Sequence, residues 1–386
     1  MSAFDGKLSP LVEQLAPSGI RRFFDLASQM DDVISLGVGE PDFVTPWHVR
    51  EACFYALERG YTTYTANAGL PALREAIAQY LETFDLSYDP KDEVLVTVGG
   101  SEAIDLALRA VIQPGDEVLI PEPAYVSYEP CAILAGATVK KIATHAMDQF
   151  RLTEDALRAA LTKRSKVLIL CAPNNPTGAI LDRVALAQIA SVAIAHDLLV
   201  ISDEIYAELT YGVRHVSIAS LPGMKERTIV ISGMSKAYAM TGWRIGYATA
   251  PRDVLAAMVK IHQYTMLCAP IMGQMAALEA LRNGERERQA MVEQYDQRRR
   301  FVVKRLREIG LACHEPQGAF YAFPDIRASG LSSEAFAEQL LKVERVAVVP
   351  GAVFGPSGEG FVRCSYATSL AQLERAFERM DRFLNS

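Results

Sequence analysis

The sequence predicts an α/β protein with a large three-layer α/β/α domain, built on a mostly parallel sheet, and a smaller α/β domain. From about residue 46 to 283, short β-branched and apolar runs alternate with amphipathic helical stretches. Apolar strands separated by helices are typical of a sheet that is covered on both faces. After about residue 284 the pattern changes to one long helical stretch, a strand-like segment at 318–323 and a terminal α/β mixture. We therefore expect a large domain over 46–283 and a small domain made of 1–45 together with 284–386.

Five apolar runs are the predicted strands of the large sheet. In chain order they are Val94–Val98, Glu117–Ile120, Lys166–Leu170, Leu199–Ser202 and Thr228–Ile231. Ligands of open α/β sheets bind beyond the carboxyl ends of the strands, so polar residues that follow these runs are candidates for the site. Such residues occur after all five runs: Gly99–Ser101, Pro121–Tyr125, Asn174 with Asn175, Asp203, and Ser235 with Lys236.

Composition and charge argue against several classes of protein. The chain has 386 residues, of which 50% are hydrophobic and 22% charged, as in ordinary soluble enzymes. A net charge of −7 argues against a surface for nucleic acid or anionic membrane, and no apolar stretch is long enough to span a bilayer. Six cysteines without paired spacing predict free thiols in a reducing cytoplasm. The six histidines form no HxxxH pair, so we expect no metal site.

The segment Ser232–Tyr247 is the most informative motif. It places Lys236 just beyond a predicted buried strand and Arg244 eight residues later. Desolvation and a neighbouring cation both lower the pKa of a lysine, which suits an amine that acts as a nucleophile. The planar fork of an arginine suits a phosphate. Together they predict a lysine that forms a Schiff base with a phosphorylated aldehyde cofactor, pyridoxal 5′-phosphate.

Three polar residues after the middle strands suit the ring of such a cofactor. Asp203 ends a predicted buried strand, where a carboxylate can keep a pyridine nitrogen protonated; taken alone, it would more simply be a helix N-cap. Tyr206 either hydrogen-bonds the ring hydroxyl oxygen or packs in the core. Asn175 either belongs to the turn Asn174–Gly178 or binds the cofactor oxygen and a substrate carboxylate.

Other candidates suit the phosphate and the substrate. Gly99–Ala103 joins a strand to an apolar helix, so backbone N–H groups at a helix N-terminus can face a phosphate. Tyr125 either stacks on the pyridine ring or simply packs. Arg363 lies in the apolar run Phe361–Ser365, and a buried arginine needs a protein carboxylate or a ligand carboxylate. The joint occurrence of these residues after successive strands favours the functional interpretation.

These residues, in this order, resemble the fold-type I pyridoxal-phosphate-dependent aminotransferases of class I and II. The resemblance extends from Gly39–Phe43 to Arg363, and its most specific part is Ser-Lys followed by Met-Thr-Gly-Trp-Arg-Ile-Gly-Tyr. It implies Lys236 as the Schiff-base residue and proton shuttle. It also implies Asp203 at the pyridine nitrogen, Tyr206 and Asn175 at the ring oxygen, Gly100, Ser101, Ser235 and Arg244 around the phosphate, Tyr125 stacked on the ring, and Arg363 with the backbone of Gly39 at the substrate α-carboxylate.

The resemblance also bears on assembly and substrate. It implies that Tyr64 reaches the phosphate of a neighbouring subunit, and hence a homodimer with shared active sites. Ser18–Arg22, His262–Tyr264 and Gly351–Phe354 resemble bacterial N-acetyl-LL-diaminopimelate aminotransferases of lysine biosynthesis. The implied reaction moves an amino group between an L-amino acid and a 2-oxo acid, with glutamate and 2-oxoglutarate as one pair.

Several alternatives stay open. Related aspartate enzymes can carry a lysine in the phosphate turn, where this chain has Ser101, which disfavours strict aspartate use. Arg21 or Arg22 could meet a distal carboxylate instead. Aspartate and aromatic amino acids are alternative substrates, and a carbon–sulfur β-lyase would use the same cofactor residues. A cofactor-sensing regulator is disfavoured, because no basic helical extension accompanies the predicted fold.

Overall fold

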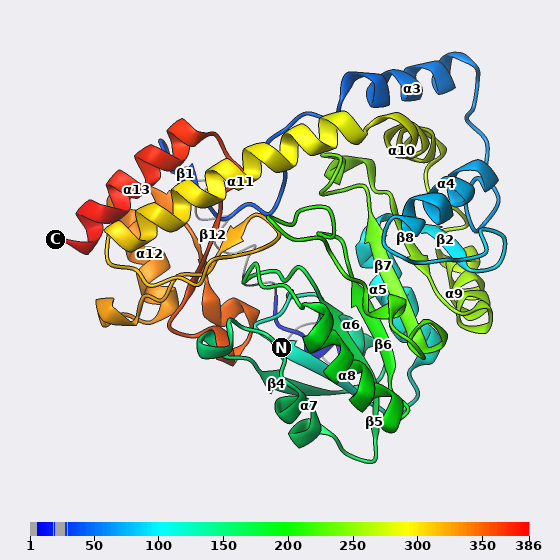
Figure 1. The fold of residues 1–386 in the computed structure, drawn as a ribbon, viewed down its shortest axis with the longest axis horizontal. Helices are drawn as coiled ribbons and strands as arrows, with labels where there is room; N and C mark the ends of the chain where they lie inside the picture. The colour runs from blue at the N-terminus through cyan, green and yellow to red at the C-terminus, as the bar shows by residue number, and fades with distance from the viewer. Residues whose placement is uncertain (1–5, 18, 20–27, 29, 386) are drawn as a thin grey trace.

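A seven-stranded sheet forms the centre of the computed structural model, which describes residues 6–17, 19, 28 and 30–385 (Figure 1). From edge to edge its strands are β2 (Val94–Thr97), β8 (Gly246–Thr249), β7 (Thr228–Gly233), β6 (Leu199–Asp203), β5 (Ser165–Cys171), β3 (Glu117–Glu122) and β4 (Thr138–Ala143). β8 is antiparallel to both of its neighbours, and the other paired strands are parallel. The predicted mostly parallel sheet is confirmed.

Two strands of this sheet, β4 and β8, were not predicted from the apolar runs. β4 lies at the edge, where it pairs with β3 alone, and its exposed Lys140 and Lys141 mask its strand character. β8 is fully buried but contains Gly246 and other small residues, which do not produce a β-branched run. In addition, Pro121 and Glu122 belong to the end of β3 and do not follow it.

Helices cover both faces of the sheet. Alternate residues of β5 show this: Val167 and Ile169 pack with α5, α6 and α9, whereas Leu168 and Leu170 pack with α7 and α8. This period of two is the one that a strand imposes on its side chains. The helices around the sheet are α4 (Pro71–Glu82), α5 (Gly99–Val111), α6 (Tyr128–Leu134), α7 (Glu154–Ala160), α8 (Arg183–Ala195), α9 (Arg252–Thr265) and α10 (Ile271–Asn283).

The C-terminal part of the chain forms a second, smaller α/β arrangement, on the left of Figure 1. Its helices are α11 (Glu285–Glu308), α12 (Ser333–Glu344) and α13 (Leu370–Leu384), and its three-stranded antiparallel sheet consists of β11 (Val349–Pro350), β12 (Val362–Ser365) and β9 (Tyr321–Ala322). β1 (Ile34–Ser35) pairs with β10 (Val346–Ala347), so the N-terminal segment joins the C-terminal part. This pairing supports the predicted division into 46–283 and 1–45 with 284–386, which stays a prediction.

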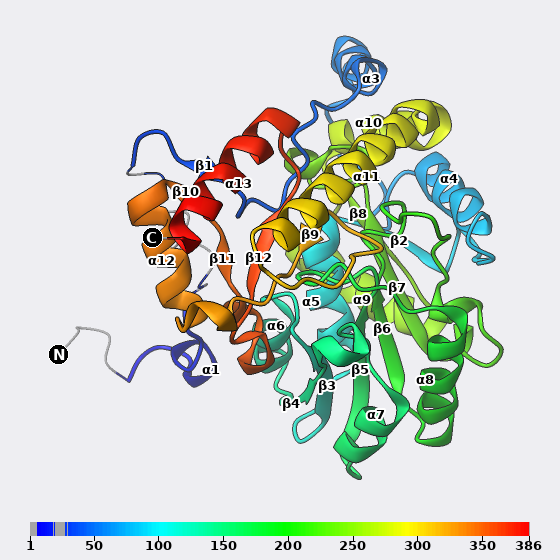
Figure 2. The same ribbon diagram turned by 60° about the vertical axis from the view of Figure 1, so that its left-hand side comes forward.

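Two short N-terminal helices lie outside these layers. α1 (Pro10–Glu13) is near α6, and α3 (Trp47–Glu58) packs mainly on α10. Figures 1 and 2 both show α3 projecting from the body of the molecule. Among the helices of the described ranges, none combines the length and the apolar content needed to cross a membrane.

Candidate active site

Lys236 lies in the turn after β7, partly buried against aromatic rings. Its Nζ donates a hydrogen bond to the carbonyl oxygen of Gly39 at 2.6 Å. The same nitrogen is 5.9 Å from the ring centre of Tyr206 and 5.8 Å from that of Phe320. The lysine amine therefore lies between the end of the large sheet and the N-terminal segment that carries Gly39.

The surroundings of Lys236 favour its neutral form. Burial above all, with a contribution from the cations Arg363 and Arg244, lowers the pKa of Lys236 to about 8, while Glu40 and Asp203 act in the opposite direction. At neutral pH a larger share of this amine is therefore uncharged than for a solvated lysine. That is the property the sequence motif predicted for a nucleophile.

Asp203 is a buried carboxylate at the end of β6, with 5% of its surface exposed. Its Oδ2 accepts a hydrogen bond from the Tyr128 hydroxyl at 2.6 Å, and its Oδ1 accepts one from the N–H of Ile205 at 3.2 Å. Burial raises the pKa of Asp203, and the Tyr128 hydrogen bond opposes that rise. A turn follows Asp203 and not a helix, so the N-cap alternative is wrong. A cationic ring nitrogen is the kind of partner such a carboxylate lacks.

Tyr206 belongs to a pair of buried phenols. Its hydroxyl is 2.7 Å from that of Tyr321 on β9. Burial raises the pKa of Tyr206 well above its usual range, so this hydroxyl stays protonated and can donate. A Cβ on Gly39 would lie 2.7 Å from the Tyr321 hydroxyl, which explains a glycine where the N-terminal segment passes the pair.

Arg363 is held inside β12 with 2% of its surface exposed. Its Nη1 donates to Oδ1 of Asn175 at 2.9 Å, and its Nη2 donates to the carbonyl oxygen of Gly37 at 2.6 Å. Its Nε has no hydrogen-bond partner among the described residues, and in the same ranges no carboxylate forms an ion pair with it. Of the two alternatives from the sequence, the structure favours a ligand carboxylate.

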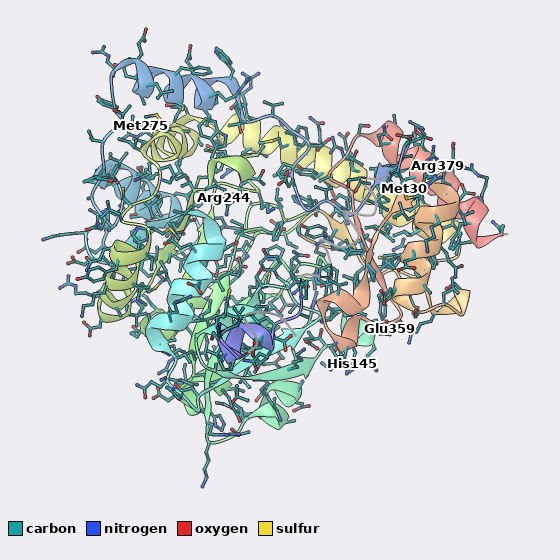
Figure 3. All side chains as sticks on the ribbon, turned by 180° about the vertical axis from the view of Figure 1, so that it is seen from behind. Met30, His145, Arg244, Met275, Glu359 and Arg379 are labelled. Atoms are coloured by element: carbon teal, nitrogen blue, oxygen red, sulfur yellow. The ribbon has the colours of Figure 1, made fainter. Side chains whose placement is uncertain are left out.

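The N-terminal end of α5 meets Arg244. α5 begins after Val98, which supplies no side-chain cap within the described residues. Gly99 has a φ of +78°, and a Cβ there would lie 2.3 Å from Nη2 of Arg244. Arg244, at a φ of +55°, donates from Nη1 to the carbonyl oxygen of Thr241 at 2.9 Å, and Figure 3 shows it beside this end of α5. The N–H of Val98 is bound by Glu102, and the N–H groups of the first turn that follow, beside an exposed arginine, fit a phosphate.

Most of the remaining predicted residues lie near the site, and Tyr64 does not. Gly100 and Ser101 are in the first turn of α5, and Ser235 is buried next to Lys236. Tyr125 is half-buried, with its ring edge-on to Tyr128 at 5.5 Å. Tyr64, 82% exposed in the loop between α3 and α4, is not brought into the site of its own chain. The suggested residues Arg21 and Arg22 lie outside the described ranges.

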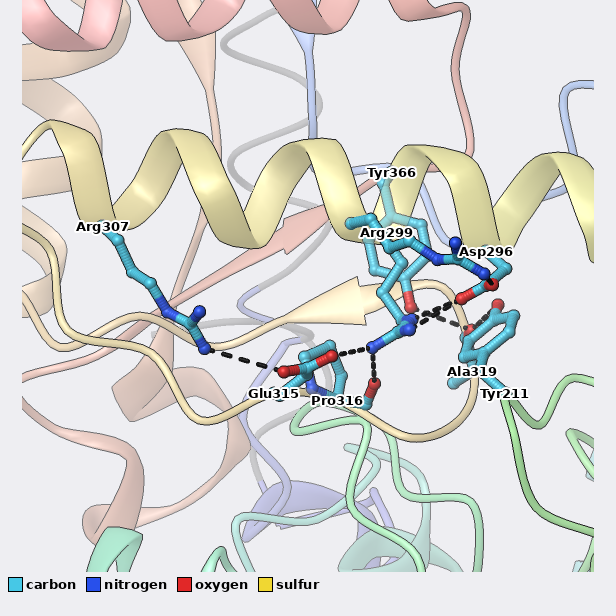
Figure 4. A network of polar contacts seen from close by, with 9 residues as sticks. Tyr211, Asp296, Arg299, Arg307, Glu315, Pro316, Ala319 and Tyr366 are labelled. Atoms are coloured by element: carbon cyan, nitrogen blue, oxygen red, sulfur yellow. Dashed lines mark hydrogen bonds and ion pairs between the residues drawn. The ribbon is translucent and has the colours of Figure 1, made fainter.

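A network under α11 holds the segment that carries Phe320 and Tyr321 (Figure 4). Tyr211 and Tyr366 both donate to the carbonyl oxygen of Ala319, at 3.2 Å for Tyr366. Beside them the guanidinium of Arg299, on α11, binds Asp296, Glu315 and the carbonyl oxygen of Pro316. These contacts fix the position from which Tyr321 reaches Tyr206.

Sequence reasoning missed Tyr128 and Tyr321. Each makes its decisive contact with a residue far along the chain, 75 positions away for Tyr128 and 115 for Tyr321. Tyr128 had one available signal, since it stands three residues after Tyr125, where the short helix α6 begins.

Comparison with known proteins gives the site its chemical class, that of enzymes dependent on pyridoxal phosphate. The chain belongs to the aminotransferases of class I and II, whose family model matches residues 31–380. The glycine-rich N-terminal end of α5, the buried Asp203 and the partly neutral Lys236 fit the phosphate, the ring nitrogen and the aldehyde of that cofactor. The predicted enzyme class and cofactor are thereby confirmed.

Individual relatives agree on amino transfer and differ in substrate. A putative aminotransferase, YugH of Bacillus subtilis, is 58% identical over 98% of both chains. An aspartate aminotransferase of Pyrococcus abyssi is 48% identical over 98% of both chains. A probable N-acetyl-LL-diaminopimelate aminotransferase of Bacillus subtilis is 43% identical over 98% of this chain and 95% of the relative. The solved aromatic aminotransferase of Pyrococcus horikoshii, 48% identical, superposes with a TM-score of 0.90 over 95% of this chain and 98% of that one.

Proposed function

We propose that this aminotransferase works on L-amino acids and 2-oxo acids, with glutamate and 2-oxoglutarate as one pair and N-acetyl-LL-diaminopimelate as the other donor. One observation supports the proposal that the substrates are amino acids. Nζ of Lys236 and Nη2 of Arg363 bind the carbonyl oxygens of Gly39 and Gly37, which lie in one short segment. A substrate carboxylate that takes the place of the Gly37 contact therefore brings its own α-carbon close to the lysine.

Lys236 is the proton carrier in this proposal. Bound pyridoxal phosphate supplies an electron sink that acidifies the hydrogen on the substrate α-carbon. The neutral amine of Lys236 would take that proton and deliver it to the cofactor carbon that carries the aldehyde. Arg363 orients the substrate carboxylate by a paired contact with its planar fork. The lowered pKa of Lys236 supports this role.

The other residues hold the cofactor in place. Asp203 keeps the ring nitrogen protonated, and Tyr206 donates to the ring oxygen. Asn175 uses its Oδ1 for Arg363, so its Nδ2 is the atom available for the same ring oxygen. Around the ring and phosphate we assign Tyr125 as the stacking residue and Gly100, Ser101, Ser235 and Arg244 as the phosphate site.

We also propose a homodimer with shared active sites, in the cytoplasm. α3 and the loop after it carry a group of exposed apolar side chains, a kind of surface that often marks a protein–protein interface. They are Trp47 (58% exposed), Phe54 (57%), Tyr55 (50%), Leu57 (50%), Tyr61 (45%) and Tyr64 (82%). A second copy that covers this surface would let Tyr64 reach the phosphate of its partner. The six cysteines, scattered without paired spacing, support a reducing compartment.

Sedimentation analysis tests the dimer. Phe54→Glu should give a monomer that retains less cofactor, because a buried charge at an apolar interface is costly. Val184→Glu is the matched control, since Val184 is 71% exposed on α8, away from this surface. A Phe54→Glu variant that stays dimeric would contradict this choice of interface.

Absorbance titration of the loaded enzyme with single amino acids tests the reaction. Glutamate and N-acetyl-LL-diaminopimelate should each bleach the visible band of the cofactor, with release of the matching 2-oxo acid. Lys236→Ala should bind cofactor without turnover. If aspartate or tyrosine were a better donor than N-acetyl-LL-diaminopimelate, the proposed substrate would be wrong, while the proposed amino transfer would stand. Ammonia and pyruvate from cystathionine would support the β-lyase alternative.

A further inference from the structure

We infer that His262 and Glu102 form a positioning pair that keeps the N-terminal end of α5 open for the cofactor phosphate. The inference rests on the proposed function, in which the phosphate lies at this end of the helix. His262 belongs to the segment His262–Tyr264, to which the assigned cofactor and substrate contacts give no role. Neither residue of the pair is among the groups proposed to touch the cofactor.

The start of α5 lacks the usual competitor for a ligand. The first N–H groups of a helix have no partner within the helix, and a Ser, Thr, Asp or Asn side chain at the N-cap commonly binds one of them. Here the N-cap is Val98, which provides no such acceptor within the described ranges. The N–H groups of the glycine-rich first turn are therefore available to an anion.

One acidic side chain in that turn is a potential competitor. Glu102 is the acidic residue of the first turn of α5. The partial positive charge at a helix N-terminus attracts carboxylates as well as phosphates. If the Glu102 side chain turned to the N–H groups of the first turn itself, it would occupy them and repel a bound phosphate.

Two contacts hold Glu102 away from this position. Its Oε2 accepts a hydrogen bond from the N–H of the N-cap residue Val98, and its Oε1 is 2.6 Å from Nδ1 of His262, so neither oxygen turns to the N–H groups of the first turn. An ionised carboxylate can only accept, so Nδ1 of His262 carries the hydrogen of this bond. Both oxygens of the side chain are therefore engaged, and it is 8% exposed.

His262 is placed for this one contact. It lies in the last turn of α9, which packs along α5, and it is completely buried. Its Nε2 has no hydrogen-bond partner among the described residues. A fully buried histidine whose polar contact is a single carboxylate implies that the position of this carboxylate matters.

The test compares the affinities of the apo-enzyme for pyridoxal phosphate and for pyridoxal, which lacks the phosphate. In His262→Leu the released carboxylate should weaken the binding of pyridoxal phosphate by about tenfold, the scale of one charge at a helix end. The affinity for pyridoxal should stay unchanged. Glu102→Gln added to His262→Leu should restore most of the loss, because the competing charge is gone. Absorbance or fluorescence titration gives both dissociation constants without a measurement of turnover.

Two further variants make the comparison specific. His215→Leu removes another buried histidine–carboxylate contact, 2.9 Å between Nε2 of His215 and Oε2 of Glu204, and should leave the ratio of the two dissociation constants at its wild-type value. Glu102→Asp keeps the charge but shortens its reach to His262. It should lower the preference for the phosphorylated ligand even if His262→Leu does not fold.

Each outcome either supports or overturns the positioning role of His262 and Glu102. An unchanged ratio in Glu102→Asp or in a folded His262→Leu overturns the inference. So does a double variant that binds pyridoxal phosphate no better than His262→Leu. If the wild-type protein binds both ligands equally, the proposed phosphate position itself is wrong, which is a separate failure.

Discussion

The two arginines near Lys236 are held in different ways. Arg363 is buried in the central strand of a three-stranded sheet, with hydrogen bonds to Asn175 and Gly37 and its guanidinium 4.5 Å from the ring centre of Tyr321. Arg244 is exposed, donates to the carbonyl oxygen of Thr241 and lies against Gly99. One end of the site is thus organised within the chain, whereas the other presents charge to solvent.

The two ends can therefore select their ligands in different ways. A side chain that is already fixed in place loses little conformational freedom when it binds, so its contacts contribute more fully to affinity. We expect Arg363 to act with little rearrangement. The exposed end around Arg244 depends more on the phosphate itself and, in the proposed dimer, on Tyr64 of a second copy.

The largest effect should come from removal of the organised arginine. Arg363→Gln should lower kcat/KM by about 100-fold, because a charged hydrogen bond to a ligand contributes about 3 kcal/mol. KM should rise while the affinity for pyridoxal phosphate stays near the wild-type value. Steady-state kinetics and a cofactor titration check the two parts separately. A large loss of cofactor affinity would mean that Arg363 supports the cofactor and not the substrate.

The second effect concerns pH and compares the two arginines directly. Because the pKa of Lys236 is lowered to about 8, the rate at which the apo-enzyme captures pyridoxal phosphate should rise about tenfold per pH unit below 8 and then level off. Both arginines lower this pKa, and the contribution of Arg363 exceeds that of Arg244. Arg363→Gln should therefore move the break to higher pH by more than Arg244→Gln does.

Stopped-flow absorbance over a series of pH values gives this profile. If the rate in the wild-type protein kept rising up to a pH near 10.5, the ordinary pKa of a lysine, the pKa of Lys236 would not be lowered. Equal shifts in the two variants would remove the predicted asymmetry between the two ends.

A smaller effect should follow from filling the exposed end. Gly99→Ala should weaken the binding of pyridoxal phosphate by about tenfold, the scale of one hydrogen bond to a charged group, because the added Cβ displaces Arg244. The positive φ adds a separate cost in stability. Pyridoxal should bind as before. Gly115→Ala is the matched control, because Gly115 has a φ of +95° and open space around it. It should lose stability without any change in ligand preference.

The fold was largely predictable from the sequence, because β5, β6 and β7 are continuous apolar runs that a sheet covered on both faces requires. The positions of Asp203 and Lys236 at the edge of the sheet were predictable as well, since each lies at or just beyond the end of such a strand, while their roles stay predictions. β4 was not predictable, because an edge strand pairs on one side and tolerates polar residues.

Contacts between positions far apart in the chain could not be predicted from the sequence. The Tyr128 hydroxyl meets Asp203 only because α6 packs on the same face of the sheet as the end of β6. Likewise, local spacing does not bring His262 to Glu102, which are 160 positions apart. Such residues look like ordinary core side chains until the helices are placed on the sheet.

The smallest predicted effect concerns Tyr128, which touches neither end of the site directly. Tyr128→Phe removes the hydroxyl that lowers the pKa of Asp203, so this pKa should rise further above its usual range. The neutral carboxyl then becomes more populated, and the ring nitrogen is held less firmly. We expect kcat to fall about fivefold, in line with about 1 kcal/mol for one hydrogen bond.

Infrared absorption of the protonated carboxyl group in the apo-enzyme reads this change without turnover. The midpoint of its titration should move to higher pH in Tyr128→Phe. Tyr295→Phe is the control, because Tyr295 is completely buried and its hydroxyl has no partner among the described residues. If both variants leave the midpoint in place while kcat falls in Tyr128→Phe alone, the Tyr128 hydroxyl does not act through the pKa of Asp203.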